Sequence, residues 1–155
     1  MNYQSVGVKG YTSLNHARIF NIALNARCNI LQHLHWKGIL TYARATDDKD
    51  GNLPFIRPLS YQTSLHFMYK KFGIQTSLNG DITQSNYSPE YGEDQTPAYM
   101  ILNVSANYSF NIKNCKTVLQ VGAENLLNEY YSTYADWGNI PRMGRNIFTS
   151  LKFSF

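Results

Sequence analysis

The chain has 155 residues, of which 43% are hydrophobic, 14% aromatic and 15% charged, and its formal net charge is +4. Soluble domains usually carry about 25% charged residues, so charge is scarce here while aromatic residues are abundant. No run of Lys and Arg accompanies the modest positive charge, which argues against a nucleic-acid-binding surface. No stretch reaches the roughly 18 to 20 apolar residues of a membrane-spanning helix, but that test does not apply to a β-barrel.

Eight segments alternate apolar and polar side chains with the two-residue period that predicts β-strands. In chain order they cover residues 5–11, 17–31, 36–45, 61–70, 74–83, 99–110, 117–127 and 145–155. The alternation is clearest over 99–110, where Leu102 and Val104 oppose Asn103 and Ser105. The last segment has the same pattern, with Phe148 as its one misfit. Polar faces made mostly of Asn and Ser are unusual for the outside of a soluble sheet, which would carry Lys and Glu.

Short links and long loops alternate between these segments. The long loops are predicted at 46–58, 84–98 and 128–144. Strands of about 10 residues match the 9 to 11 residues that a tilted strand needs to cross a bilayer, and the rhythm matches outer-membrane barrels. We therefore expect an all-β fold: an antiparallel transmembrane β-barrel segment with short periplasmic turns and long extracellular loops.

The C-terminal part of the sequence resembles a known family. GAENLLNEYY at 122–131, followed by PRMGRNIFTSLKFSF at 141–155, is similar to the closing strands of TonB-dependent outer-membrane receptors. Three further stretches resemble the same family in the same order: ARIFNIALNA at 17–26, LPFIRP at 53–58 and TPAYMILNVSANYSF at 96–110. Met143 departs from the family pattern, which usually has Pro there, and Leu127 departs from a common Phe.

The resemblance implies only a portion of a receptor. A complete receptor is a barrel of about 22 strands with an N-terminal plug inside it, whereas 1–155 resembles the last eight or so strands, without a plug or a TonB-contacting box. The implied partners are outer-membrane lipid, the remaining strands and plug of the same receptor, TonB through that plug, and the barrel-assembly machinery, for which the terminal Phe155 is the expected signal. The start of the chain lacks the pattern of a signal peptide, so a truncated chain is expected.

Aromatic and cationic residues of the predicted loops are the candidate ligand contacts. They suit a bulky, often anionic ligand such as an iron–siderophore, although membrane-interface belts and loop packing explain many of the same residues. The candidates are Arg57, Tyr87, Tyr91, Tyr134, Trp137 and Arg142.

No motif predicts an enzyme, a cofactor or a metal site. His33 and His35 supply two potential ligands, too few for a site, and the acidic run around Asp47 lacks the EF-hand spacing, which favours a solvated loop. Asp81 and Glu124 lie on polar faces, where we expect polar networks inside the barrel to satisfy them. Four or five strand spacings, about 20 Å, separate Cys28 from Cys115, so no disulfide is expected.

Two alternatives remain open. The first is a complete small outer-membrane barrel of eight strands with a structural or adhesive role, which would need its own signal peptide. The second is a soluble lipocalin-like barrel, in which the aromatic side chains would point inward.

Overall fold

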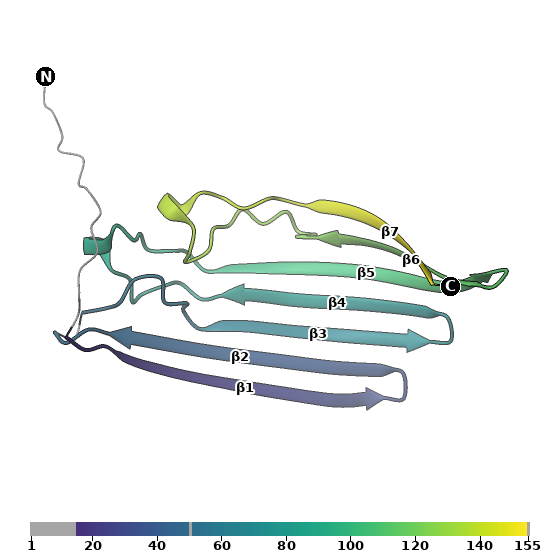
Figure 1. Cartoon of the computed structure of the whole chain (residues 1–155), viewed down its shortest axis with the longest axis horizontal. Coiled ribbons are helices and arrows are strands. Elements are labelled where there is room, and N and C mark those ends of the chain that lie inside the picture. The colour runs from purple at the N-terminus through teal and green to yellow at the C-terminus, as the bar shows by residue number, and fades with distance from the viewer. Residues whose placement is uncertain (1–14, 50, 155) are drawn as a thin grey trace, which may run out of the picture.

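The computed structural model describes residues 15–49 and 51–154. Seven antiparallel strands form one sheet in which each strand pairs with its neighbours in sequence (Figure 1). The strands are β1 (Arg18–Leu31), β2 (Leu34–Thr46), β3 (Ser60–Tyr69), β4 (Phe72–Asp81), β5 (Tyr99–Ile112), β6 (Cys115–Glu124) and β7 (Asn146–Ser154). The strand predicted at 5–11 and the terminal Phe155 lie outside the described residues.

Three two-residue links join the strands at one end of the sheet, as the sequence pattern predicts. They are residues 32–33, 70–71 and 113–114. Lys70 and Lys113 both adopt a φ of 52°, which gives these links the left-handed backbone that two-residue hairpins favour. The partners that flank two of the links, Tyr69↔Phe72 and Ile112↔Cys115, are paired directly.

Strand bounds differ from the prediction by at most three residues, and a left-handed residue explains the largest difference. The strand predicted at 117–127 begins earlier and ends at Glu124, because Asn125 adopts a φ of 47° and stops the extended chain. The strand predicted at 74–83 covers Phe72–Asp81. The long loops are consequently residues 47–59, 82–98 and 125–145.

Strand register separates the two faces of the sheet. Apolar side chains meet across neighbouring strands, as in Leu78↔Leu102 and Leu119↔Leu151. On the other face Ser77 pairs with Asn103, and Asn107 pairs with Gln120. Exposed large apolar side chains recur along the first face, including Leu24, Val121 and Leu151. A broad exposed apolar face opposite a polar one is the arrangement of a barrel wall with lipid outside and a polar lumen inside.

Phe148, the misfit of the last predicted strand, lies opposite Gly122 on the polar face. A Cβ atom added to Gly122 would lie 2.6 Å from Phe148 Cζ, so the ring occupies the space above the glycine. An aromatic side chain that covers a glycine on the adjacent strand is a known way to stabilise a sheet. The break in alternation is therefore a packing feature of the β6–β7 pair.

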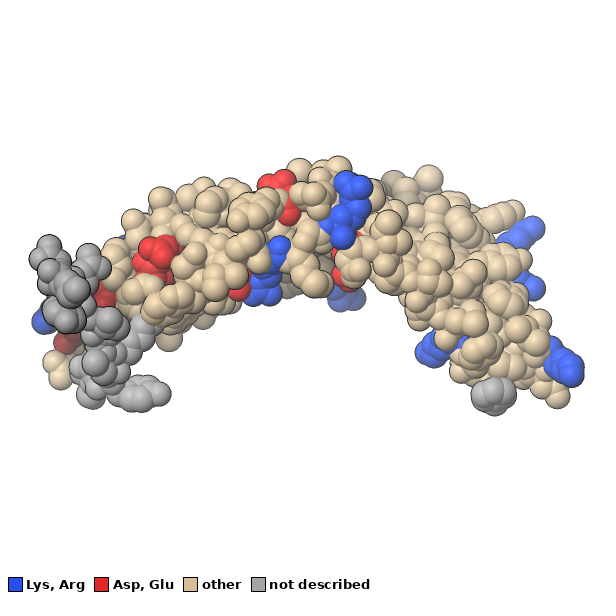
Figure 2. Space-filling view, turned by 90° about the horizontal axis from the view of Figure 1, so that it is seen from above, with Lys and Arg blue, Asp and Glu red and all other residues tan. Residues whose placement is uncertain are grey.

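The sheet is curved, and its apolar core is small (Figure 2). The buried hydrophobic residues among those described are Ala45, Tyr99 and Ile101, which lie near the ends of strands beside the long loops. Within residues 15–154, β1 and β7 each pair on one side only. None of the described helices has both the length and the apolar character to cross a bilayer.

Candidate functional site

The three long loops gather at one end of the sheet, opposite the short links (Figure 1). Most buried polar residues belong to these loops or to the strand ends beside them: Ser60, Asp81, Gln84, Ser88, Glu93, Thr96, Asn125 and Ser132. Buried polar groups are usually hydrogen-bonded, and the side chain of each of these eight residues makes at least one hydrogen bond, although Gln84 Oε1 has no partner among the described residues. We refer to loops 47–59, 82–98 and 125–145 together as the loop face.

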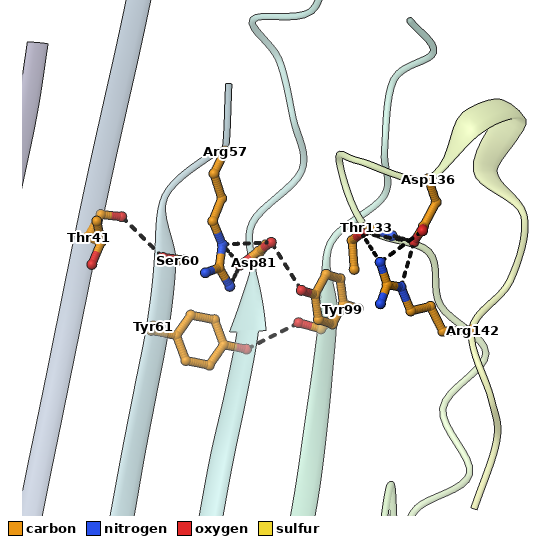
Figure 3. Close-up of polar contacts among 9 residues, drawn as sticks. All are labelled: Thr41, Arg57, Ser60, Tyr61, Asp81, Tyr99, Thr133, Asp136 and Arg142. Carbon is orange, nitrogen blue, oxygen red and sulfur yellow. Dashed lines mark hydrogen bonds and ion pairs between the residues drawn. The ribbon is translucent and has the colours of Figure 1, made fainter. Parts of the chain in front are cut away.

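Arg57, Asp81 and Tyr99 form the first polar cluster of the loop face (Figure 3). Arg57 Nη2 donates to Asp81 Oδ1 at 2.8 Å, and Arg57 Nε lies 3.1 and 3.3 Å from the two carboxylate oxygens. The Tyr99 hydroxyl donates to Asp81 Oδ2 at 3.0 Å. Asp81 is only 3% exposed, whereas the Arg57 side chain is 47% exposed. The hydrogen bond to Asp81 raises the pKa of Arg57, which keeps it charged. The expectation that a polar network satisfies Asp81 is confirmed.

Thr133, Asp136 and Arg142 form the second cluster, within loop 125–145 (Figure 3). Arg142 donates from Nε to Asp136 Oδ2 at 2.8 Å and from Nη2 to Oδ1 at 2.9 Å. The backbone N–H and the hydroxyl of Thr133 each donate to Asp136 Oδ2 at 2.8 Å. The hydrogen bonds from Arg142, helped by those from Thr133, lower the pKa of Asp136 to about 2. The same pairing raises the pKa of Arg142.

Two tyrosine rings connect the clusters. The ring of Tyr99 lies 4.8 Å, centroid to centroid, from the ring of Tyr131. The backbone N–H of Arg142 donates to the carbonyl of Tyr131 at 2.8 Å. The fold thereby places Arg57 and Arg142, two predicted contact residues that are far apart in sequence, in neighbouring clusters with Tyr99 between them (Figure 3).

The other predicted contact residues lie elsewhere on the loop face. Tyr91 ends the short 3-10 helix η1 (Pro89–Tyr91), and Trp137 begins η2 (Trp137–Asn139) and is more than half exposed. Tyr87, Tyr91 and Tyr134 are half-buried. Among the described residues, no side-chain hydrogen bond or ring contact joins these three tyrosines to either arginine.

Glu93 holds two loops together, and sequence reasoning missed it. Its Oε1 accepts from the Phe55 backbone N–H at 3.0 Å and from Gln84 Nε2 at 2.8 Å, while its Oε2 accepts from the Ser88 backbone N–H at 2.8 Å. The Ser88 hydroxyl also donates to the carbonyl of Asn52. Loops 47–59 and 82–98 are therefore joined around one buried carboxylate.

Asn139 and Asn125 fix the third loop. The Asn139 side chain donates to the Gln95 carbonyl at 3.0 Å and accepts from Thr96 Oγ1 at 3.3 Å, which ties loop 125–145 to loop 82–98. Asn125, within the ENLLN motif, donates from Nδ2 to the Glu129 carbonyl and accepts from the Glu129 N–H, both at 2.8 Å. Both asparagines have positive φ, a conformation that this residue tolerates better than most. The motif signalled Asn125, but no local signal pointed to Asn139.

The residues considered above for metal binding or for a disulfide have the following surroundings in the structure. Asp47 Oδ1 accepts from the backbone N–H groups of Lys49 and Gly51, so it closes its own loop. His35 Nδ1 lies 2.8 Å from Asn29 Oδ1. In the part of the chain that the structure describes, no three His, Cys, Asp or Glu side chains gather as a metal site. Cys28 and Cys115, on β1 and β6, are free thiols.

The fold and the loop face define a class: a wall segment of an outer-membrane β-barrel, with its long loops gathered at one end. Comparison with protein families identifies the particular family. The family described as TonB dependent receptor-like, beta-barrel matches residues 2–126, and the chain belongs to it. This membership implies location in the outer membrane.

A solved structure has the same fold. The chain is similar to Copper transporter OprC, with 20% sequence identity and a TM-score of 0.80, over 90% of this chain and 24% of that one. The chain thus spans about a quarter of the length of that protein. The comparison with curated proteins gave no match.

Proposed function

We propose that residues 1–155 form the C-terminal portion of the barrel of a TonB-dependent receptor that imports an iron–siderophore or a related metal chelate. Other parts of the receptor supply the plug, the remaining strands and the contact with TonB. The family match and the coverage of 24% of a structurally similar transporter support a partial barrel. In this reading the loop face is the extracellular surface that first meets the ligand.

The single observation that carries this proposal is the pair of fixed arginines. Arg57 and Arg142 each use Nε and Nη2 for a carboxylate, and their side chains are 47% and 48% exposed. A guanidinium has five N–H donors in a rigid plane, so Nη1 remains able to donate to an anion while the ion pair persists. Fixing the arginines in advance lowers the entropy cost of binding.

The tyrosines of the loop face favour a metal chelate over a bare metal ion as the ligand. Tyr131, whose ring packs on that of the buried Tyr99, and the half-buried loop tyrosines offer flat apolar surface on the same loop face as the two positive charges, which suits an aromatic, anionic chelate. The solved structure named as a copper transporter raises copper as a second candidate cargo. A bare Cu²⁺ ion would be repelled by two arginines, and Cu prefers imidazole or sulfur ligands.

Quenching of tryptophan fluorescence tests the proposal. The full chain, folded in detergent micelles, is titrated with the ferric tris-catecholate of 2,3-dihydroxybenzoate, and Trp137 on the loop face reports binding. Arg142→Gln should weaken binding about tenfold, the effect of losing one charge-assisted hydrogen bond.

Arg145→Gln is the matched control, because it removes the same charge from the same loop and its side chain makes no recorded bond among the described residues. It should change the affinity less than twofold. Equal losses in the two variants would show general charge attraction and would remove Arg142 from the site. Saturable binding of CuCl₂, without binding of the ferric chelate, would favour the copper alternative.

A further inference from the structure

Charge is divided unevenly between the two ends of the sheet. All described acidic residues lie in the long loops or at the strand ends that adjoin them, Asp81 and Glu124 being the two at strand ends. The half of the sheet that carries the short links has only cations among its described charges: Arg27, Lys37, Lys70, Lys71, Lys113, Lys116 and Lys152. Figure 2 shows this for the face in view, where the linked end carries blue but no red.

An aromatic row marks the membrane boundary beside these cations. Tyr69 pairs with Phe72, and Phe72 pairs with Tyr108, so three rings lie side by side across β3, β4 and β5 on the apolar face. All three are at least 40% exposed. Aromatic rows of this kind lie at the level of the lipid headgroups in membrane barrels. The link 70–71 follows Tyr69 directly and therefore lies at headgroup depth.

Lys70 points toward the lipid side of this boundary. Its Nζ lies 5.2 Å from the centroid of the Tyr69 ring, which belongs to the apolar face. His33, from the neighbouring link, contacts the same ring edge-on at 5.3 Å. Among the described residues, neither Lys70 nor Lys71 has a carboxylate partner.

Backbone hydrogen bonds hold the links in place. The Met68 N–H donates to the His33 carbonyl at 2.9 Å, and the Ser109 N–H donates to the Lys71 carbonyl at 2.8 Å. Three adjacent hairpins are thereby joined at this rim, so the backbone positions from which the lysine side chains extend are set before anything binds.

We propose that Tyr69, Lys70, Lys71 and His33 form a binding site for the phosphate of an anionic phospholipid in the periplasmic leaflet. Lysines beside the headgroups attract anionic lipids, and a ring at the boundary packs against the upper part of the acyl chains. The site rests on the assignment of the chain to an outer-membrane barrel, but on neither arginine of the loop face.

Lipid binding by the full chain in dodecylmaltoside micelles tests the site. Native mass spectrometry gives apparent affinities for dimyristoyl phosphatidylglycerol, which is anionic, and for the zwitterionic phosphatidylcholine with the same chains. The wild-type chain should prefer the anionic lipid. Lys70→Gln together with Lys71→Gln should weaken its binding about 10- to 30-fold, because each lysine at the surface contributes about 1 kcal/mol.

The matched control removes two charges from the other end. Lys49→Gln together with Arg145→Gln should leave the preference unchanged, and circular dichroism should show the same β-structure in all three proteins. Equal affinity for both lipids, or equal losses in the two double variants, would overturn the site. If the chain bound poly-L-glutamate but not the anionic lipid, link 70–71 would be a contact for an acidic protein, and the lipid site would also be overturned.

The result of the lipid-binding test can be distinguished from the result of the ferric-chelate test of the proposed function. If the Lys70→Gln, Lys71→Gln variant loses the preference for the anionic lipid but still binds the ferric chelate as the wild type does, the lipid site is supported and the ligand proposal is unaffected. A wild-type chain that retains neither lipid would overturn the barrel assignment, and the lipid site with it.

Discussion

At the scale of single residues, two ion pairs and a set of buried hydrogen bonds hold the loop face together. Asp81 is almost fully buried, and its recorded side-chain partners are Arg57 and Tyr99. A buried carboxylate that loses its partner is costly, because the charge remains without the water that would otherwise solvate it. The pair thus holds loop 47–59 against the ends of β4 and β5.

Arg57→Ala should destabilise the folded chain by about 2 kcal/mol. This is less than the loss of a fully buried pair, because the Arg57 side chain is half-exposed. Urea unfolding in lipid vesicles, followed by circular dichroism, measures the difference. Arg145→Ala, which removes an exposed arginine that forms no ion pair with any described residue, should stay close to wild type. A cost for Arg57→Ala no larger than that of this control would show that water satisfies Asp81.

The second ion pair makes a prediction about pH. The pKa of Asp136 is lowered from 3.8 to about 2, chiefly by the hydrogen bonds from Arg142. Because the folded pKa lies below the unfolded one, the ionised carboxylate stabilises loop 125–145 above pH 3.8, and this contribution is lost as the pH falls toward 2. A ¹³C NMR titration of the Asp136 carboxyl should show a midpoint near 2 in the wild type and a rise toward 3.8 in Arg142→Gln. An unchanged midpoint would mean that Thr133 alone lowers the pKa.

At the scale of elements, alternation predicted the strands because the polar and apolar faces meet different surroundings. The seven described strands all overlap predicted segments, and their described ends differ from the predicted ones by at most three residues. The predicted strand ends were less accurate. Some of them depend on residues with a left-handed backbone, such as Asn125 and Lys70, and the alternation of apolar and polar residues does not reveal this conformation. Glu93 and Asn139 could not be predicted, because their partners come from other loops and no local pattern encodes such contacts.

Phe148 offers a test of packing between two strands. Phe148→Ala should cost about 1 kcal/mol, because it uncovers Gly122 on β6. Gly122→Ala should destabilise the wild type, since its Cβ would lie 2.6 Å from the ring, and should cost less in the Phe148→Ala background. Urea unfolding of the two single variants and the double variant gives the coupling energy. Additive costs would show that the ring does not pack on the glycine.

At the scale of the whole molecule, the two faces of the sheet decide between the membrane barrel and a soluble lipocalin-like barrel. The register places Val104 on the apolar face near the middle of β5, next to Thr76 and Ala123 on the adjacent strands. Gln75 lies on the polar face near the middle of β4, opposite Ser105. In a membrane barrel the first position meets hydrocarbon and the second meets the lumen, whereas a soluble barrel reverses the two.

Val104→Arg should therefore destabilise the chain by about 2 to 4 kcal/mol in lipid vesicles, the cost of a charge at the middle of a bilayer. Gln75→Arg adds the same charge at a similar depth, where the lumen can solvate it, so it should cost less than about 1 kcal/mol. Folding yield and urea midpoint in vesicles measure both variants against wild type. Equal costs would mean that neither face meets lipid, and a larger cost at Gln75 would indicate that the apolar face is not the one in the membrane. A larger cost at Val104 than at Gln75 would show, on two adjacent strands, that the apolar face of the sheet meets lipid and the polar face meets the lumen.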